Sequence, residues 1–332
     1  MKFPIMKTLR IFLMLSAFLS TSFQLAHAQY GYLSFANEDK GIFTSTSEAI
    51  YGSDNSDGNL SASVYFAYFP ESADPDIQYL FSIQQDAFTP GHEAKKSPTA
   101  VPGRRSFAGY LALNAVRFKR HNDLHQGNLF KIGNQTNMEV RAGVIGPASK
   151  VQAFQDFFHD IIGATDYQGW NDQIVNRYGG SMRIDQLFPI GVSAFEKNDL
   201  EITPHITLVA GNLLQYASAG LQLRIGDDLE DFGGQRFNYY TGGETPVGPA
   251  KWQLYAGWER RFMDRNYTLD GKTKETQIVS AQKTDEYDET QVGVRTKLGD
   301  YVLDISLVQR GLEFTTQDSK QQFVRIGLGR KF

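Results

Sequence analysis

The chain has 332 residues, with 33 Lys and Arg against 37 Asp and Glu, so its formal net charge at pH 7 is −4. This acidic balance argues against nucleic acid as a partner, because nucleic-acid binding depends on a basic surface. The sequence contains no cysteine, which excludes disulfide bonds and cysteine zinc sites.

Residues 1–28 predict a secretory signal peptide. Three basic residues precede an apolar run over 11–26, and Ala26 and Ala28 then supply a small-x-small cleavage site. The run is shorter than a membrane-spanning helix requires, and a polar, turn-forming sequence follows it. We therefore expect residues 29–332 to form the folded protein as a single domain.

Polar residues follow the first predicted strand. Asn37, Glu38 and Asp39 stand at its end, and Ser61 stands at the start of the second strand. Their amide, carboxylate and hydroxyl oxygens are the hard ligands that calcium prefers. Such a triplet at a strand end is also common in solvated turns, so spacing alone leaves both interpretations open.

A basic cluster occupies the polar insert 90–106, at Lys95, Lys96, Arg104 and Arg105. On an acidic protein, these four side chains could bind phosphate groups, those of lipopolysaccharide if the protein lies in an outer membrane. They could equally form a charged loop that contributes only to solubility. The sequence leaves these two interpretations open.

The stretch 151–165 predicts a short helix in a chain that otherwise alternates like strands. Gln152, Gln155 and His159 form a polar stripe beside an apolar face, and Gly163 supplies a stop. One interpretation is that the aromatic face packs on the rest of the protein and leaves His159 partly solvated; the other is that His159 marks a functional site. The apolar face consists of Phe154, Phe157, Phe158, Ile161 and Ile162.

Apolar and polar residues also alternate in the second half of the chain. Leu254 and Trp258 share one face of a predicted strand whose opposite face is polar. Counting back from Phe332, Leu328 and Ile326 are apolar and their neighbours are glycine or basic. A final strand of this kind is typical of outer-membrane barrels, in which apolar side chains face lipid and polar ones face the lumen.

Counting such segments predicts an all-β transmembrane antiparallel barrel of about twelve strands, with the short helix at one rim. Ten or fourteen strands remain open, and the alternative is a soluble β-sandwich or barrel. The 24 Phe, 16 Tyr and 3 Trp favour the membrane barrel, because aromatic girdles mark its interfaces. The candidate strands lie near 31–38, 61–70, 77–88, 105–118, 136–146, 179–190, 200–210, 214–226, 250–263, 275–287, 290–299 or 301–311, and 321–332.

The available chemistry fits ester hydrolysis. That reaction needs a base for water and a positive centre for the developing oxyanion. His159 is the candidate base, and Asn37, Glu38 and Ser61 are candidate oxygen groups around a calcium ion.

Several motifs together resemble the outer-membrane lipid A 3'-O-deacylases, and the resemblance runs from about residue 31 to the C-terminus. Their occurrence in the same order makes the likeness more specific than any single spacing. The motifs are SFANEDKGIF (34–43), IQQDAFTP (83–90), GVIGPASKVQAFQDFFHDIIGA (143–164), WNDQIVNRYG (170–179), GNLLQY (211–216) and RRFMDRNYTLDGKT (260–273).

The resemblance implies a twelve-stranded barrel that removes the 3'-linked acyloxyacyl group of lipid A in the outer leaflet, with calcium as cofactor. It also implies an outer-membrane location. The family's essential residues fall on Asn37, Glu38, Ser61 and His159. The family's glutamine one turn before the histidine falls on Gln155, and its basic, lipid-contacting pair falls on Lys95 and Lys96.

The chain departs from the family pattern at two positions. Glu38 stands where the best-known members have Asp, and Thr165 stands where they have a catalytic Glu. Asp166 follows at once, and a continuing helix would return it to the His159 side, seven residues on. Our hypothesis is that Asp166 supplies the missing carboxylate as a metal ligand, together with Glu38 and Ser61.

Other classes of function remain as alternatives. A degenerate, non-catalytic relative could bind lipopolysaccharide or form a small pore, and Thr165 favours this alternative. A related esterase could act on another outer-leaflet lipid. We expect a monomer, because a closed barrel has no free edge that requires a partner.

Overall fold

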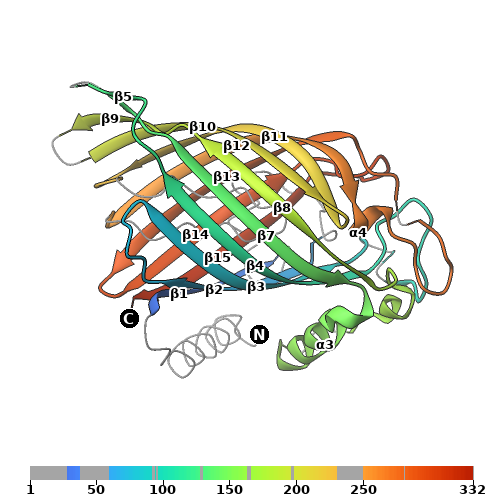
Figure 1. Cartoon of the computed structure of the whole chain (residues 1–332). Coiled ribbons are helices and arrows are strands. Elements are labelled where there is room, and N and C mark those ends of the chain that lie inside the picture. The colour runs from blue at the N-terminus through green and yellow to red at the C-terminus, as the bar shows by residue number, and fades with distance from the viewer. Residues whose placement is uncertain are drawn as a thin grey trace.

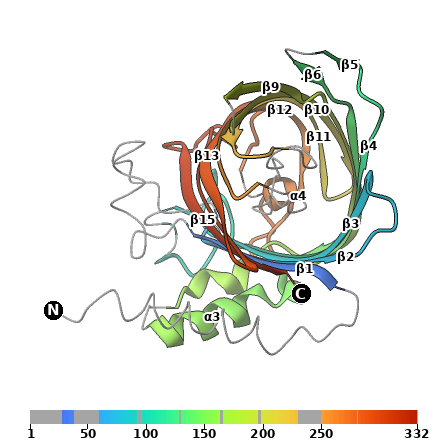
Figure 2. The same cartoon turned by 90° about the vertical axis from the view of Figure 1, so that its left-hand side faces the viewer.

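The described residues form a barrel of antiparallel strands. The computed structural model describes residues 28–37, 60–91, 94, 96–127, 130–162, 166–195, 198–229, 250–279 and 281–331. Within them, twelve long strands wind around a common axis (Figures 1 and 2). In chain order the strands are β1 (Ala28–Asn37), β2 (Ala62–Pro70), β3 (Ile77–Phe88), β4 (Ala108–Arg120), β7 (Gln135–Ile145), β8 (Arg177–Leu187), β10 (Asn198–Gly211), β11 (Leu214–Gly226), β12 (Trp252–Asn266), β13 (Glu286–Leu298), β14 (Tyr301–Arg310) and β15 (Gln321–Lys331).

The barrel is closed, since each of these twelve strands has a partner on both sides. β1 pairs with β2 and with β15, and β10 pairs with β8 and with β11. Closure satisfies the backbone hydrogen bonds between strands, which a membrane cannot do. The prediction of a twelve-stranded antiparallel barrel is confirmed.

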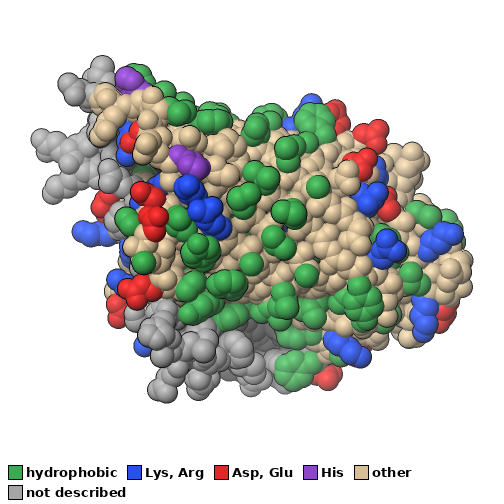
Figure 3. Space-filling view, viewed as in Figure 1, with side chains coloured by type: hydrophobic (Ala, Val, Ile, Leu, Met, Phe, Trp, Pro, Cys, Tyr) green, Lys and Arg blue, Asp and Glu red, His purple; other side chains and the backbone are tan. Residues whose placement is uncertain are grey.

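The wall alternates as the sequence predicts. Leu208, Leu254 and Trp258 expose 61%, 50% and 45% of their surface on the outside of the wall. Apolar side chains are scattered over this outer face (Figure 3). The surface therefore matches a wall that faces lipid, whereas the alternate residues turn into the lumen.

Ion pairs fill the middle of the lumen. Arg261 lies 2.5 Å from Glu259 and 3.1 Å from Glu289, and His205 Nε2 lies 3.2 Å from Glu259 Oε2. Arg261 and Glu259 expose none of their surface. This packing argues against an open pore at that level. The pairs continue to the rim in the order His205, Glu259, Arg261, Glu289, Arg310, Glu313 and Arg105.

The glycines of β15 make room for tyrosines of β1. A Cβ at Gly327 would lie 1.7 Å from the hydroxyl of Tyr32, and one at Gly329 would lie 1.4 Å from the hydroxyl of Tyr30. Both tyrosines are buried on the lumen side. Glycine at these two positions therefore lets bulky rings cross the junction between the first and last strands.

One predicted strand, 275–287, is wrong. Most of this segment is a loop, and β13 begins only at Glu286. The apolar residue Ala281 does not face lipid. It packs on Leu269 and Phe314 in a small cluster at the rim. The alternatives 290–299 and 301–311 are both strands, which restores the count of twelve.

Two α-helices and three short strands add to the barrel in the described part of the chain. α3 (Val151–Ile162) lies outside the ring of strands, whereas α4 (Tyr267–Asp270) lies over the lumen (Figure 2). The short strands extend the sheet at the opposite rim from α3 (Figure 1); they are β5 (His125–Gln126), β6 (Lys131–Ile132) and β9 (Ile190–Phe195). Neither α3, with 12 residues, nor α4, with 4, could span a membrane as a helix.

Several predictions fall on residues outside the described ranges. They concern residues 1–27 of the predicted signal peptide, whose last residue, Ala28, begins β1. They also concern Glu38, Asp39, Lys95, Gly163 and Thr165.

Candidate active site

The residues just before α3 place the helix against the outside of the barrel wall. A 3-10 turn, Pro147–Ser149, precedes the helix, and Lys150 takes a left-handed conformation with φ 59°. Ser149 Oγ donates to the Gly146 carbonyl at 2.6 Å. A Cβ at Gly109 in β4 would lie 2.3 Å from Ser149 Oγ and 2.6 Å from Val151 Cβ. Glycine in the wall therefore allows the start of the helix to approach β4 closely.

The polar stripe of α3 faces the protein. His159 and Gln155 expose 8% and 7% of their surface, whereas Phe154 and Phe157 expose 39% and 60%. The interpretation in which the aromatic face packs on the protein is therefore wrong for these residues. Outside a membrane barrel the surroundings are apolar, so an apolar face can turn outward there. The side chains of Phe158, Ile161 and Ile162 lie outside the described part of the structure.

His159 sits between an acidic group and an aromatic ring. Its Nδ1 lies 3.4 Å from Asp166 Oδ1, and the ring of Tyr167 meets the imidazole edge-on with 5.4 Å between centroids. Within the described ranges, Nδ1 forms no hydrogen bond. Burial raises the pKa of the nearby Asp156 carboxyl, and the charge of Asp166 raises it further. The structure thus brings Asp166 to the His159 side, although α3 ends at Ile162 and Asp166 itself is not helical, so the expected helical continuation is not the reason.

Gln155 is held by a residue that the sequence analysis missed. Trp170 Nε1 donates to Gln155 Oε1 at 2.8 Å. Trp170 is buried, and its ring centroid lies 5.0 Å from that of Phe107. The available signal was the tryptophan of the WNDQ motif, since a buried tryptophan usually finds a partner for its N–H.

Asn37 and Ser61 lie at the same rim as the start of α3. Asn37 pairs with Ala62 across β1 and β2, so its backbone lies beside that of Ser61. Ser61 Oγ forms a hydrogen bond with Thr89 Oγ1. Ala62 packs on the cluster that contains Val151, the first residue of α3. The structure therefore gathers these elements, although the side chain of Asn37 lies outside its described part.

Two members of the basic cluster are engaged within the protein. Arg105 is buried and lies 2.9 Å from Glu313, and its guanidinium lies over the ring of Phe88. Arg104 forms an ion pair with Asp318. Lys96 is exposed at the surface.

Asp172 connects its own segment by hydrogen bonds to two other loops near the site, one at Ala100 and one at Glu275 and Thr276. Its Oδ2 accepts from the Ala100 N–H at 2.9 Å and from the Thr276 hydroxyl at 2.7 Å. Its Oδ1 accepts from the N–H groups of Glu275 at 2.6 Å and Thr276 at 3.0 Å. Burial alone would raise the pKa of Asp172, but these hydrogen bonds outweigh it and hold the pKa below its ordinary value. Asp172 follows Trp170 by two residues, so it anchors the segment that holds Gln155.

Asp172→Asn is expected to loosen this anchor at neutral pH. Asparagine has one acceptor oxygen where the carboxylate has two, so partly exposed N–H groups lose a charged hydrogen-bond partner, at a cost of about 1 kcal/mol. Hydrogen exchange at Ala100, Glu275 and Thr276 measures the effect. Because the folded-state pKa is lowered, the wild-type anchor should hold above about pH 3.9 and weaken only as the pH falls through the folded pKa. Equal protection in both proteins at pH 7 would contradict this role.

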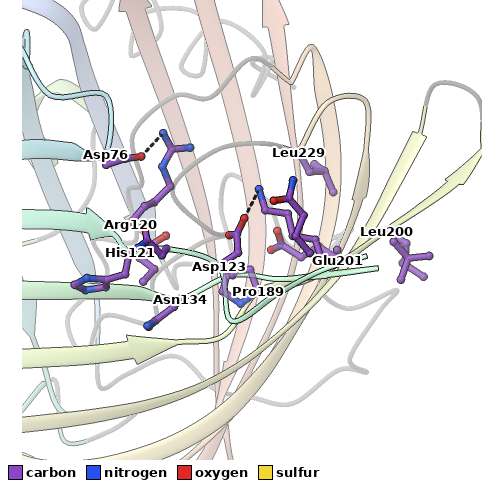
Figure 4. A pocket seen from close by; sticks show the side chains of 16 residues that line it. Asp76, Arg120, His121, Asp123, Asn134, Pro189, Leu200, Glu201 and Leu229 are labelled. Carbon is purple, nitrogen blue, oxygen red and sulfur yellow. Dashed lines mark ion pairs between the residues drawn. The ribbon is translucent and has the colours of Figure 1, made fainter. Parts of the chain in front are cut away.

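A separate cavity lies at the opposite rim (Figure 4). It has a volume of about 650 Å³. Its basic side chains are paired, Arg120 with Asp76 at 3.4 Å and Lys131 with Asp123 at 3.2 Å. None of the predicted site residues lines it, so it is distinct from the candidate site at α3.

The oxygen donors at the α3 rim suit calcium in kind. Ser61 and Thr89 supply hydroxyl oxygens and Asp166 supplies a carboxylate, which are hard ligands. Among the described side chains, no group of three or more His, Asp and Glu could hold a metal ion. A calcium site built from this part of the chain would therefore use hydroxyl oxygens as well as carboxylates.

A family model and one solved structure agree with this architecture. A family model described as "Outer membrane protein LpxR" matches residues 13–332. The solved structure of LpxR from Salmonella typhimurium is 28% identical, with a TM-score of 0.81, and the match covers 91% of this chain and 100% of that one. The translocator domain of autotransporter NalP from Neisseria meningitidis is 10% identical with a TM-score of 0.38, covering 99% and 98%. No curated protein matches the sequence.

Proposed function

Because the chain belongs to the LpxR family of outer-membrane lipid A 3'-O-deacylases, we propose that it is a calcium-dependent esterase. Its substrate is the 3'-linked acyloxyacyl group of lipid A in the outer leaflet. The protein is located in the bacterial outer membrane. The observation that carries the proposal is the orientation of α3, with His159 and Gln155 against the barrel wall and Phe157 exposed.

His159 acts as the general base. It removes a proton from water, the water oxygen attacks the 3' ester carbonyl, and the released sugar hydroxyl takes a proton as the C–O bond breaks. Asn37 and Ser61 stand at the same rim as the start of α3, where their polar groups can stabilise the carbonyl oxygen. Calcium, when bound through Glu38, Ser61 and Asp166, would add positive charge that stabilises the developing oxyanion.

The position of the site outside the barrel supports a membrane lipid as substrate. α3 contacts β3 and β4 from outside the ring of strands. Acyl chains can therefore remain in the leaflet while the ester reaches His159. Lys95 and Lys96 would bind the phosphates of the headgroup. The closed barrel supports a monomer, because every long strand is already paired.

The proposal is tested by mass spectrometry of lipid A from cells that express the protein and from cells that carry an empty vector. The expected result is loss of the mass of the 3' acyloxyacyl group only in expressing cells. With purified protein, removal of calcium by a chelator should stop the reaction, and added calcium should restore it. An unchanged lipid A profile in expressing cells would refute the enzyme assignment.

Asp166→Asn is expected to lower the deacylation rate by roughly 10–100-fold, the usual cost of losing a carboxylate that supports a metal or its neighbouring residue. The measurement is the rate against calcium concentration. Recovery at high calcium would identify Asp166 as a ligand, whereas a loss that calcium does not restore would assign it to orientation of His159. Asp160→Asn makes the same change at an exposed position of α3 and should leave the rate unchanged. An undiminished rate in Asp166→Asn would refute either role.

A second candidate is a non-catalytic relative that binds lipopolysaccharide. Thr165, in place of the family's glutamate, is the observation that favours it. In that case the protein would bind lipid A without changing its mass. The buried ion pairs of the lumen argue against the pore-forming version of this alternative.

A further inference from the structure

Trp170 is held rigidly beside the candidate site. It lies in the 3-10 turn Gln168–Asp172, whose last residue is the loop anchor Asp172. The preceding Gly169 packs so closely that a Cβ there would lie 2.2 Å from the Phe107 ring and 2.8 Å from the Ser97 carbonyl. The indole therefore has little freedom to move, and its N–H points at Gln155 at 2.8 Å.

This hydrogen bond determines which way the Gln155 amide faces. An indole N–H can only donate, so the atom that it meets must be the carbonyl oxygen of the glutamine. The NH₂ group of Gln155 is left on the other side of the amide. Among the described residues it donates to no acceptor, and it lies on the same helical stripe as His159, one turn earlier.

We propose that Trp170 is a positioning residue that orients the Gln155 amide so that its NH₂ group donates to the carbonyl oxygen of the substrate ester. The inference rests on the proposed esterase function. Without the indole N–H, the amide can turn over and present its oxygen, which would repel the negative charge that develops on the substrate. Trp170 itself touches Gln155 and not the reacting atoms.

Three variants separate this role from simple packing. Gln155→Ala should lower kcat by roughly 10²–10³-fold, as expected when an oxyanion donor is removed. Trp170→Phe keeps an aromatic ring beside Phe107 but loses the N–H, so kcat should fall while KM changes little. Because Trp170 acts through Gln155, the double variant should be no slower than Gln155→Ala alone. Additive losses in the double variant would overturn the proposal, and Trp258→Phe on the outer wall is the matched control.

Gln155→Glu provides the sharpest test. Glutamate keeps an oxygen that accepts from Trp170 but cannot donate, so the hydrogen bond should remain while kcat falls as in Gln155→Ala. The chain has three tryptophans, so NMR can resolve their indole N–H groups. The Trp170 signal then reports on the hydrogen bond to Gln155 independently of any activity assay. The Trp170 indole N–H should exchange faster with solvent in Gln155→Ala but stay protected in Gln155→Glu. An unchanged signal in Gln155→Ala would refute the bond, whereas an intact bond in a protein without deacylase activity would refute only the proposed function.

Discussion

Replacing His159 by alanine is expected to lower the rate of lipid A deacylation by about 10²–10⁴-fold, the usual contribution of a general base. The reason lies in its surroundings. The imidazole is buried on the wall-facing side of α3, with Asp166 at Nδ1 and Tyr167 at its edge. No other histidine occurs on α3, so water would lose the basic group closest to the proposed ester position.

The measurement is the initial rate with purified protein and lipid A at saturating calcium. His121→Ala is the matched control, because His121 is exposed at the opposite rim and contacts Thr136. The control should keep the wild-type rate. Both proteins should show the same melting behaviour, so that a loss of rate reflects chemistry. A His159→Ala protein with the wild-type rate would remove the general-base assignment.

Arg261→Met is expected to destabilise the barrel by about 3–5 kcal/mol, because it removes the cation that two buried carboxylates share and leaves Glu259 with His205 alone and Glu289 with Arg310. Arg261 lies between Glu259 and Glu289, and none of its surface is exposed. Its guanidinium also lies over the rings of Tyr216 and Tyr287. Methionine fills much of the volume but replaces none of these polar contacts.

Urea unfolding in lipid vesicles, followed by tryptophan fluorescence, measures this change. Arg260→Met is the matched control, since Arg260 is the next residue and its ion pair with Asp288 is exposed. The control should unfold close to the wild type, because exposed pairs contribute little. Adding Glu259→Gln to Arg261→Met should recover part of the loss, since it removes one of the two buried charges that have lost the arginine. Equal stability of Arg261→Met and wild type would refute the proposed importance of the buried pairs.

The barrel could be predicted because strand alternation is a local property. Leu254 and Trp258 face outward as their spacing requires. The failure at 275–287 has the opposite cause. An apolar residue such as Ala281 has the same local pattern whether it faces lipid or packs on Phe314 in a loop, so only the folded chain distinguishes the two.

The helix was predictable and its orientation was not. Spacing placed Gln155 and His159 on one stripe, but the sequence alone does not say whether lipid or protein covers the apolar face. Trp170 and Asp172 were missed because their roles depend on distant loops. Asp172 accepts from Glu275, 103 residues away, and no local pattern reports such a contact. The roles of His159, Gln155, Asn37, Ser61 and Asp166 in catalysis stay predictions.

The tyrosine and glycine pairs at the junction of β1 and β15 bear on how the barrel closes correctly. A one-residue slip between these strands would turn apolar side chains into the lumen, so the alternation opposes it. A two-residue slip preserves the alternation and needs another safeguard. In the observed register the Tyr32 ring lies over Gly327 and the Tyr30 ring lies over Gly329. A two-residue slip would bring the Tyr32 ring over Arg325 or the Tyr30 ring over Lys331, where a side chain occupies the space that glycine leaves open. The two glycines thus provide space for the tyrosine rings in only one register, which selects that register when β1 pairs with β15.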